Sequence, residues 1–308
     1  MKAAVVTRLD RPPVYAEFRD PDARDGFVEV RMLAAGVHQI VRSLAAGAHY
    51  GAGDELPFVV GVDGVGLLPD GTRVYTGGSP DPFGTLAERT LVPAGFAVPV
   101  PDALSSAAAS GIANPAMSSW MPLVGRAHLA TGQTVLVLGA TGASGTLAVQ
   151  IALHLGAGRV IAAGRNREVL ARLAQDDRVT AVTFDELPDA LAGGVDVVLD
   201  YLWGPIAEQA LEALRRTGMD HVAGLISYIQ IGALAGRSIT LDAGLLRSSN
   251  IVVSGSGAGS MDRRLLLTEL PKVLALAASG GIALPVREVA LADVESAWAS
   301  SDRLVVVI

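Results

Sequence analysis

The 308-residue chain contains no cysteine, which excludes disulfides, thiol catalysis and cysteine metal ligands. Its five histidines lie far apart and show none of the spacings that bind a metal. Lysine occurs only at positions 2 and 272, and the net charge is −7, so nucleic-acid binding is not expected. These absences are typical of a cytoplasmic protein without a metal centre.

The sequence also has no clear membrane segment. Mean hydropathy is +0.42, and residues 127–158 carry no Asp, Glu, Lys or Arg over a length that would span a bilayer. That stretch nevertheless contains a glycine turn and several polar residues, and its periodicity changes from strand-like to helical. Such a pattern indicates a strand and a helix buried in an α/β domain. The first residues lack the apolar run of a signal peptide, so no membrane association is expected.

A glycine-rich turn stands at the centre of the chain. The apolar run 135–138 leads into the sequence GATGASG at 139–145, which opens an Ala- and Leu-rich helix. Glycine allows the backbone to approach a pyrophosphate, and the N-terminus of the helix supplies unpaired N–H groups. A strand, glycine turn and helix in this order predict a dinucleotide site. The alternative is a structural turn that binds no ligand.

The pattern of elements predicts two different architectures. Residues 1–118 contain short β segments between Gly- and Pro-rich turns, which indicates a barrel-like domain. The segments are 2–7, 27–34, 59–68, 73–76 and 87–92. Strands and helices alternate from residue 134, which predicts a doubly wound parallel sheet. The strands are 135–138, 159–163, 179–183, 195–200, 227–231 and 251–254, and the helices are 145–155, 168–174, 187–191 and 205–215. A helix at 265–278 follows, and the terminal RLVVVI is expected to pair back into the first domain.

Several short motifs resemble one superfamily. They are MKAAVV at the start, AAGVH at 34–38, LPFVVGVDGVG at 56–66, GTLAE at 84–88, DVVLD at 196–200 and QIG at 230–232. Together they resemble the medium-chain dehydrogenase/reductases, and most closely their zinc-independent NADPH:quinone oxidoreductase branch. The resemblance implies a GroES-like β-barrel catalytic domain at 1–118, a Rossmann NADPH-binding domain at 119–258, and a return to the catalytic domain at 259–308.

Two other assignments are disfavoured. Zinc-dependent members of the superfamily have a His-Glu pair where this chain has Val62 and Asp63, and tetrahedral zinc needs Cys or His donors. Short-chain dehydrogenases also use a GATGASG-like turn, but they place it near the N-terminus and often carry Tyr-x-x-x-Lys. This chain contains no Tyr-x-x-x-Lys sequence.

The residues after the second Rossmann strand indicate the cofactor. NAD enzymes usually have Asp or Glu there to bind the ribose 2′-hydroxyl. This chain has Gly164 followed by Arg165, which lies 23 residues after Gly142. A guanidinium matches a 2′-phosphate, so we expect NADPH. The alternative is that Arg165 is ordinary surface charge.

The resemblance also implies the positions of the site residues, in a pocket between the domains. The expected cofactor-binding residues are Ser118, Thr141, Gly142, Ala143, Ser144, Gly145, Gly164, Arg165, Tyr201, Leu202, Ile231, Gly232, Ser256 and Gly257. The expected substrate-pocket residues are His49, Asn114 and Trp203, with a core or interface role open for Trp203.

His38 and Tyr50 are the candidates for hydrogen-bonding a substrate carbonyl and supporting proton delivery. The better-known quinone reductases have Asn at the position of His38, so the transfer of roles is indirect. Cofactor contact or loop packing, with water as the proton source, remains the alternative.

These observations predict an NADPH-dependent oxidoreductase that reduces quinones or similar activated enones. The alternatives are a reductase of α,β-unsaturated ketones or thioesters, and an NADPH-binding sensor with little turnover. The superfamily commonly dimerises through the last sheet strand, so a homodimer is expected through residues 251–254.

Overall fold

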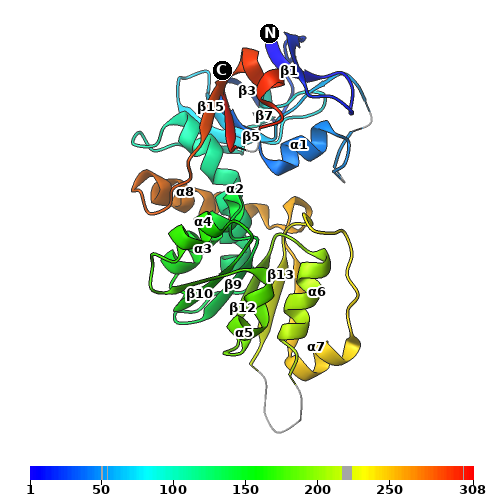
Figure 1. Ribbon diagram of the computed structural model, residues 1–308. Coiled ribbons are helices and arrows are strands. Elements are labelled where there is room, and N and C mark those ends of the chain that lie inside the picture. The colour runs from blue at the N-terminus through cyan, green and yellow to red at the C-terminus, as the bar shows by residue number, and fades with distance from the viewer. Residues whose placement is uncertain (50, 54, 217–223, 301) are drawn as a thin grey trace. The chain divides into compact units, whose positions relative to one another are not determined.

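The computed structural model describes residues 1–308 except Tyr50, Asp54, residues 217–223 and Ser301. The chain divides into two compact units (Figure 1). Unit 1 contains Met1–Asn114 and Leu267–Ile308, and unit 2 contains Pro115–Leu266. Both boundaries fall inside helices, α2 (Ser106–Gly125) and α8 (Arg263–Ala278), and not in flexible linkers.

Unit 2 is built on a parallel sheet of six strands. Their order is β11-β10-β9-β12-β13-β14, in which the chain starts at the centre, runs to one edge, and then returns to run to the other. This is the doubly wound order expected of a dinucleotide-binding fold. The strands are β9 (Thr134–Leu138), β10 (Arg159–Ala163), β11 (Val179–Val182), β12 (Val197–Asp200), β13 (Ile226–Gln230) and β14 (Ile251–Gly255).

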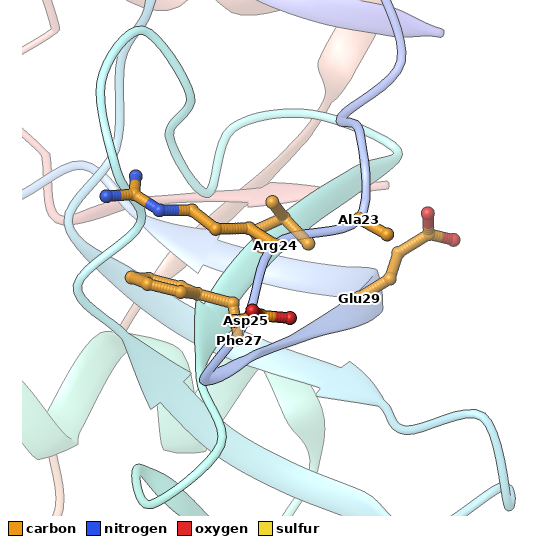
Figure 2. Close-up of a pocket in the computed structure, with 6 residues that line it drawn as sticks. Ala23, Arg24, Asp25, Phe27 and Glu29 are labelled. Atoms are coloured by element: carbon orange, nitrogen blue, oxygen red, sulfur yellow. The ribbon is translucent and has the colours of Figure 1, made fainter.

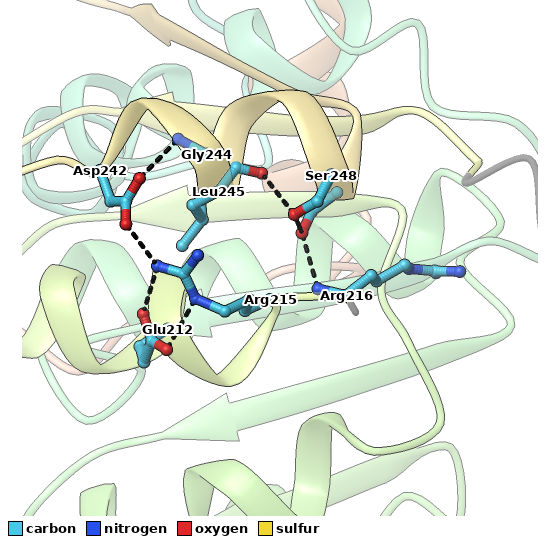
Figure 3. Close-up of polar contacts among 8 residues, drawn as sticks. Glu212, Arg215, Arg216, Asp242, Gly244, Leu245 and Ser248 are labelled. Carbon is cyan, nitrogen blue, oxygen red and sulfur yellow. Dashed lines mark hydrogen bonds and ion pairs between the residues drawn. The ribbon is translucent and has the colours of Figure 1, made fainter. Parts of the chain in front are cut away.

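Helices and turns connect these strands. They are α3 (Ala143–His154), α4 (Arg167–Leu173), α5 (Leu187–Leu191), α6 (Gly204–Ala213) and α7 (Ala243–Ser249), with short 3₁₀ helices at Phe184–Glu186 and Ala258–Ser260. Polar contacts join the end of α6 to α7 (Figure 3). Arg215 pairs with Glu212 at 2.7 Å and with Asp242, the N-cap of α7, at 3.3 Å.

The core of unit 2 explains why the strands are nearly continuous apolar runs. Leu136, Ile161 and Leu199 are fully buried, because a parallel sheet is covered on both faces. Tyr228 on β13 is also fully buried, and its hydroxyl reaches a carboxylate at the edge of the sheet.

Unit 1 is mainly antiparallel. Its larger sheet has the order β15-β16-β3-β5-β6-β8, with β7 paired to β3, and a smaller sheet has the order β2-β1-β4. The strands are β1 (Lys2–Val6), β2 (Val14–Glu17), β3 (Phe27–Gly36), β4 (Phe58–Val59), β5 (Asp63–Leu67), β6 (Arg73–Gly77), β7 (Arg89–Pro93), β8 (Ala97–Pro99), β15 (Arg287–Ala290) and β16 (Leu304–Val307). The antiparallel unit and the Rossmann unit together confirm the predicted fold class.

The two ends of the sequence meet in unit 1. The terminal strand β16 pairs antiparallel with β3, as the sequence predicted. Unit 1 also contains α1 (Gln39–Ala45), α9 (Val294–Ala297) and a 3₁₀ helix at Leu291–Asp293.

Two local predictions were wrong. The predicted strand 59–68 is divided into β4 and β5, because Gly61 adopts φ +127° between them. The region to residue 118 was interpreted as β structure, yet α2 begins at Ser106. Its many small residues and internal Pro115 give little helical signal, and burial against the rest of the unit determines its conformation. No helix in the described part of the chain combines the length and hydropathy needed to cross a bilayer.

Candidate functional site

The carboxyl ends of the parallel strands gather most of the predicted cofactor residues. Thr141–Gly145 follow β9, Gly164 and Arg165 follow β10, Tyr201 and Leu202 follow β12, Ile231 and Gly232 follow β13, and Ser256 and Gly257 follow β14. The chain reverses its direction across the sheet between β9 and β12, which are neighbours. In open α/β sheets, ligands bind at this switch point.

The glycine turn leaves its backbone open to a ligand. Gly139 adopts φ +91°, and a Cβ at Gly145 would lie 2.1 Å from the carbonyl oxygen of Gly139. Gly142 is exposed and caps α3 without any side-chain hydrogen bond to the first turn. The N–H groups that begin this 12-residue helix therefore have no side-chain cap, and the turn fits a dinucleotide pyrophosphate.

Arg165 lies on the rim beside this turn. A Cβ at Gly164 would lie 2.5 Å from the Thr141 side chain, so the end of β10 lies directly against the glycine turn. Asn166 caps α4 through the backbone N–H groups of Glu168 and Val169. Arg165 itself is exposed and makes no hydrogen bond or ion pair with the described residues. Its guanidinium is thus available to an anion.

A buried carboxylate organises the loop after β12. Asp200 Oδ1 accepts hydrogen bonds from the backbone N–H groups of Leu202 at 2.8 Å and Trp203 at 2.9 Å. Asp200 Oδ2 accepts one from the Tyr228 hydroxyl at 2.8 Å. Burial raises the pKa of Asp200, and the hydrogen bonds oppose that rise. The loop is held firmly enough that Trp203 keeps φ +56°, which is rare for a bulky residue.

The loops after β12 and β13 are joined to each other. The N–H of Ile231 donates to the carbonyl of Asp200 at 2.7 Å, and the N–H of Ala235 donates to that of Leu202 at 2.7 Å. A Cβ at Gly232 would lie 2.7 Å from the carbonyl oxygen of Tyr201, so this close approach requires glycine. The two loops form one continuous wall at the edge of the sheet.

Ser118 on α2 is connected to this wall. Its hydroxyl lies 3.2 Å from the Tyr201 hydroxyl and donates to the carbonyl of Pro115 at 2.6 Å. Burial raises the pKa of Tyr201 to about 12, so the phenol stays protonated near neutral pH. On the far side, the N–H of Ser256 donates to the carbonyl of Gln230 at 2.8 Å.

Unit 1 contains a second buried polar cluster, centred on His38. The imidazole is 2% exposed, and its Nε2 donates to Asp63 Oδ1 at 2.8 Å. Arg303 Nη2 donates to the other ring nitrogen, Nδ1, and to the carbonyl of Gly111 at 3.0 Å. The ring lies so close to Gly36 that a Cβ there would be 2.4 Å from His38 Cε1. Both nitrogens of His38 are therefore engaged within the protein.

Burial sets the charge states in this cluster. It lowers the pKa of His38, and the nearby Arg303 charge adds to the effect while Asp63 opposes it. Burial also lowers the pKa of Arg303, to about 10, so the guanidinium remains charged near neutral pH. Burial and the neighbouring Asp63 raise the pKa of Tyr75. The cluster thus combines one cation, one anion and a neutral imidazole.

The remaining predicted residues lie in different parts of the chain. Asn114, in unit 1, donates from Nδ2 to Asp63 Oδ2 at 2.6 Å. His49, also in unit 1, accepts at Nδ1 from the N–H of Gly51 at 3.0 Å. Trp203 belongs to unit 2 and lies edge-on to Tyr228, with 6.3 Å between ring centroids. Tyr50 lies outside the described residues.

A surface depression in unit 1 contains none of these residues. Figure 2 shows Arg24 extended alongside Phe27, with its guanidinium carbon 4.9 Å from the ring centroid. The depression is lined by Ala23, Arg24, Asp25, Phe27, Glu29 and Leu91. It has no bearing on the cofactor crevice or the His38 cluster.

Comparisons with known proteins agree with this geometry. Residues 143–279 match the family described as zinc-binding dehydrogenase. The chain is 32% identical to a probable NADPH-dependent quinone reductase of Emericella nidulans, over 98% of this chain and 97% of that protein. The chain belongs to the quinone-reductase branch of the medium-chain dehydrogenase/reductases.

Two further similarities lie in the same superfamily. A quinone oxidoreductase of Thermus thermophilus, solved also in complex with NADPH, superposes with a TM-score of 0.83 at 29% identity, covering all of both chains. A 2-methylene-furan-3-one reductase of Solanum lycopersicum is 28% identical over 64% of this chain and 55% of its own length.

The zinc in the description of the matching family does not fit the donors of this chain. There is no cysteine, and no group of three or more His, Asp or Glu side chains within the described ranges could hold a metal ion. His38 and Asp63 are bonded to each other, and Arg303 brings a positive charge to the other face of the imidazole. A second cation at this place would be repelled.

Four residues of the two clusters were not predicted as site residues: Asp63, Arg303, Asp200 and Tyr228. A carboxylate that ends or begins an apolar strand, as at Asp200 and Asp63, is the one signal that sequence offers. Their partners are distant in sequence, 28 residues from Asp200 to Tyr228 and 265 from His38 to Arg303.

The lowered pKa of His38 predicts acid-sensitive stability. Below pH 6.5 the unfolded chain takes up a proton at this position that the folded chain refuses, so stability present above pH 6.5 is lost as the pH falls toward the folded pKa. The loss is about 1.4 kcal/mol per pH unit between the two values. We expect the His38→Asn variant to show a shallower fall in unfolding free energy from pH 7.5 to 5.5, measured by urea denaturation. Asparagine is also a suitable N-cap for α1.

His49, whose pKa is also lowered by burial, contributes to both proteins and cancels in the comparison. Equal pH slopes for wild type and variant would contradict the assignment to His38.

Proposed function

We propose that the chain is an NADPH-dependent reductase that transfers hydride to quinones or similar activated enones without zinc. The observation that carries this proposal is the glycine turn at the switch point of the doubly wound sheet, with Arg165 beside it and unpaired among the described residues. The names of the similar proteins support the acceptor class, since a quinone and a 2-methylene-furan-3-one are both conjugated carbonyl compounds.

NADPH supplies the hydride in this proposal, and the protein supplies binding and orientation. The N–H groups from Thr141 to Gly145 bind the pyrophosphate, and Arg165 binds the 2′-phosphate. The wall formed by the loops after β12, β13 and β14 holds the rest of the cofactor, through Tyr201, Leu202, Ile231, Gly232, Ser256 and Gly257, with Ser118 behind Tyr201.

Proton delivery is assigned to water. Both ring nitrogens of His38 are engaged and the ring is buried, so it offers no proton to a substrate. In this proposal His38 has a positioning role.

The first test is acceptor-dependent oxidation of NADPH by the purified protein. We expect turnover with a panel of quinones and enones, a clear preference for NADPH over NADH, and no loss of rate after treatment with a zinc chelator. Tight NADPH binding without turnover on any acceptor would favour a sensor instead. Loss of activity on chelation that zinc restores would contradict the absence of a metal.

Arg165 accounts for cofactor selectivity in this proposal. A charge-assisted hydrogen bond contributes about 1.5–3 kcal/mol, so Arg165→Gln is expected to reduce the preference for NADPH about ten- to a hundredfold, less at high salt because the rim is exposed. The measurement is the ratio of kcat/KM for NADPH to that for NADH. Arg172→Gln, an exposed arginine in the last turn of α4, is the matched control and should leave the ratio unchanged. An unchanged ratio in both variants would make Arg165 ordinary surface charge.

We also propose a homodimer that pairs through β14. This strand ends the described sheet, and its Val252 is 53% exposed, which for an isolated edge would invite aggregation. Light scattering should give twice the chain mass for wild type, and Val252→Lys should shift the population toward monomer. Leu234→Lys changes an exposed apolar residue outside the strands and serves as the control. A monomeric wild type would rule the dimer out.

A further inference from the structure

The hydrogen bond between Asn114 and Asp63 fixes which way a carboxamide faces. A carboxylate can only accept hydrogen bonds, so the amide nitrogen of Asn114 must point to Asp63 Oδ2, at 2.6 Å. The carboxamide oxygen therefore points away from Asp63. One N–H and the oxygen of Asn114 have no partner among the described residues, and the side chain is only partly buried.

Asp63 is itself held in place on its other oxygen. His38 Nε2 donates to Oδ1 at 2.8 Å, and Arg303 donates to the opposite nitrogen of the same ring. The imidazole therefore lies between a guanidinium and a carboxylate, which fixes its tautomer with the proton on Nε2. Asp63 is 5% exposed and His38 2%, so solvent has little access to rearrange these contacts.

Four separate segments meet in this row of side chains. Arg303 precedes the terminal strand β16, His38 caps α1, Asp63 begins β5, and Asn114 lies on α2. Each contact lies within unit 1. Of these four side chains, Asn114 is the one that is not deeply enclosed and still has hydrogen-bonding capacity toward the described residues, so the order imposed by the other three is expressed there.

We propose that Arg303, His38 and Asp63 are positioning residues that fix the carboxamide of Asn114, and that Asn114 donates its remaining N–H to the carbonyl oxygen of the acceptor. This inference rests on the proposed reduction of quinones or enones. It makes Asn114 a residue that determines affinity for the acceptor, while NADPH is bound by residues of unit 2.

The test is a double-mutant cycle on the full-length protein. Asp63→Asn allows the Asn114 carboxamide to turn, and Asn114→Ala removes it. Each single variant is expected to raise the KM for a quinone about tenfold, the effect of losing one hydrogen bond of about 1.4 kcal/mol. The Kd for NADPH, measured by fluorescence titration, should stay within about twofold of wild type.

If Asp63 acts through Asn114, Asp63→Asn adds nothing to the KM in the Asn114→Ala background. Ser110→Ala is the matched control: it removes a buried 2.9 Å hydrogen bond to the Ala34 carbonyl from the same helix, one turn earlier, and should leave the KM unchanged. Where Asp63→Asn does not fold, His38→Asn replaces it in the cycle, since it removes the ring that holds Asp63.

Additive effects of the two substitutions, or an unchanged KM in folded Asn114→Ala, would overturn the positioning of Asn114. Failure of the wild type to oxidise NADPH with any acceptor would instead overturn the proposed function, and this inference with it. A parallel rise in the NADPH Kd and the quinone KM would show general loosening of the protein and would also overturn the assignment.

Discussion

A carboxylate that is removed from water must have its lone pairs occupied, and each unit of this protein contains one such group in a decisive place. Asp200 is fully buried at the end of β12, and Asp63 is 5% exposed at the start of β5. Asp200 draws in two backbone N–H groups and the Tyr228 hydroxyl. Asp63 draws in His38 and Asn114, with Arg303 behind the imidazole. Segments distant in sequence converge because these charges require partners.

The two clusters have different consequences. Around Asp200 the partners are mostly backbone, so the carboxylate shapes a loop and holds Trp203 in a left-handed conformation. Around Asp63 the partners are side chains, so the carboxylate orients a carboxamide. The group assigned to the cofactor's 2′-phosphate, Arg165, is by contrast exposed and unpaired within the part of the chain that the structure describes. Rigid interior charges thus position the surfaces, while an exposed charge on the rim remains available for a ligand.

Much of unit 2 could be predicted from the sequence. Strand β10 and helix α5 have the predicted bounds, and the glycine turn lies at the predicted strand-to-helix junction. Apolar runs and glycine positions are local signals, so they survive without knowledge of the fold. Helix α2 was missed because its small residues and Pro115 carry no helical pattern, and burial alone makes it helical. His38 was identified as important, but its enclosure by Asp63 and Arg303 depends on contacts across 25 and 265 residues.

The sequence by itself determined the type of fold, the place of the dinucleotide turn and the basic residue beside it, because each depends on neighbours within one strand-turn-helix unit. It also determined the absence of cysteine ligands, which is a matter of composition. Only the tertiary structure decided what each buried polar group does. Whether an imidazole presents a free nitrogen or has both nitrogens engaged depends on which distant side chains the fold brings within hydrogen-bonding distance, and no local pattern encodes that.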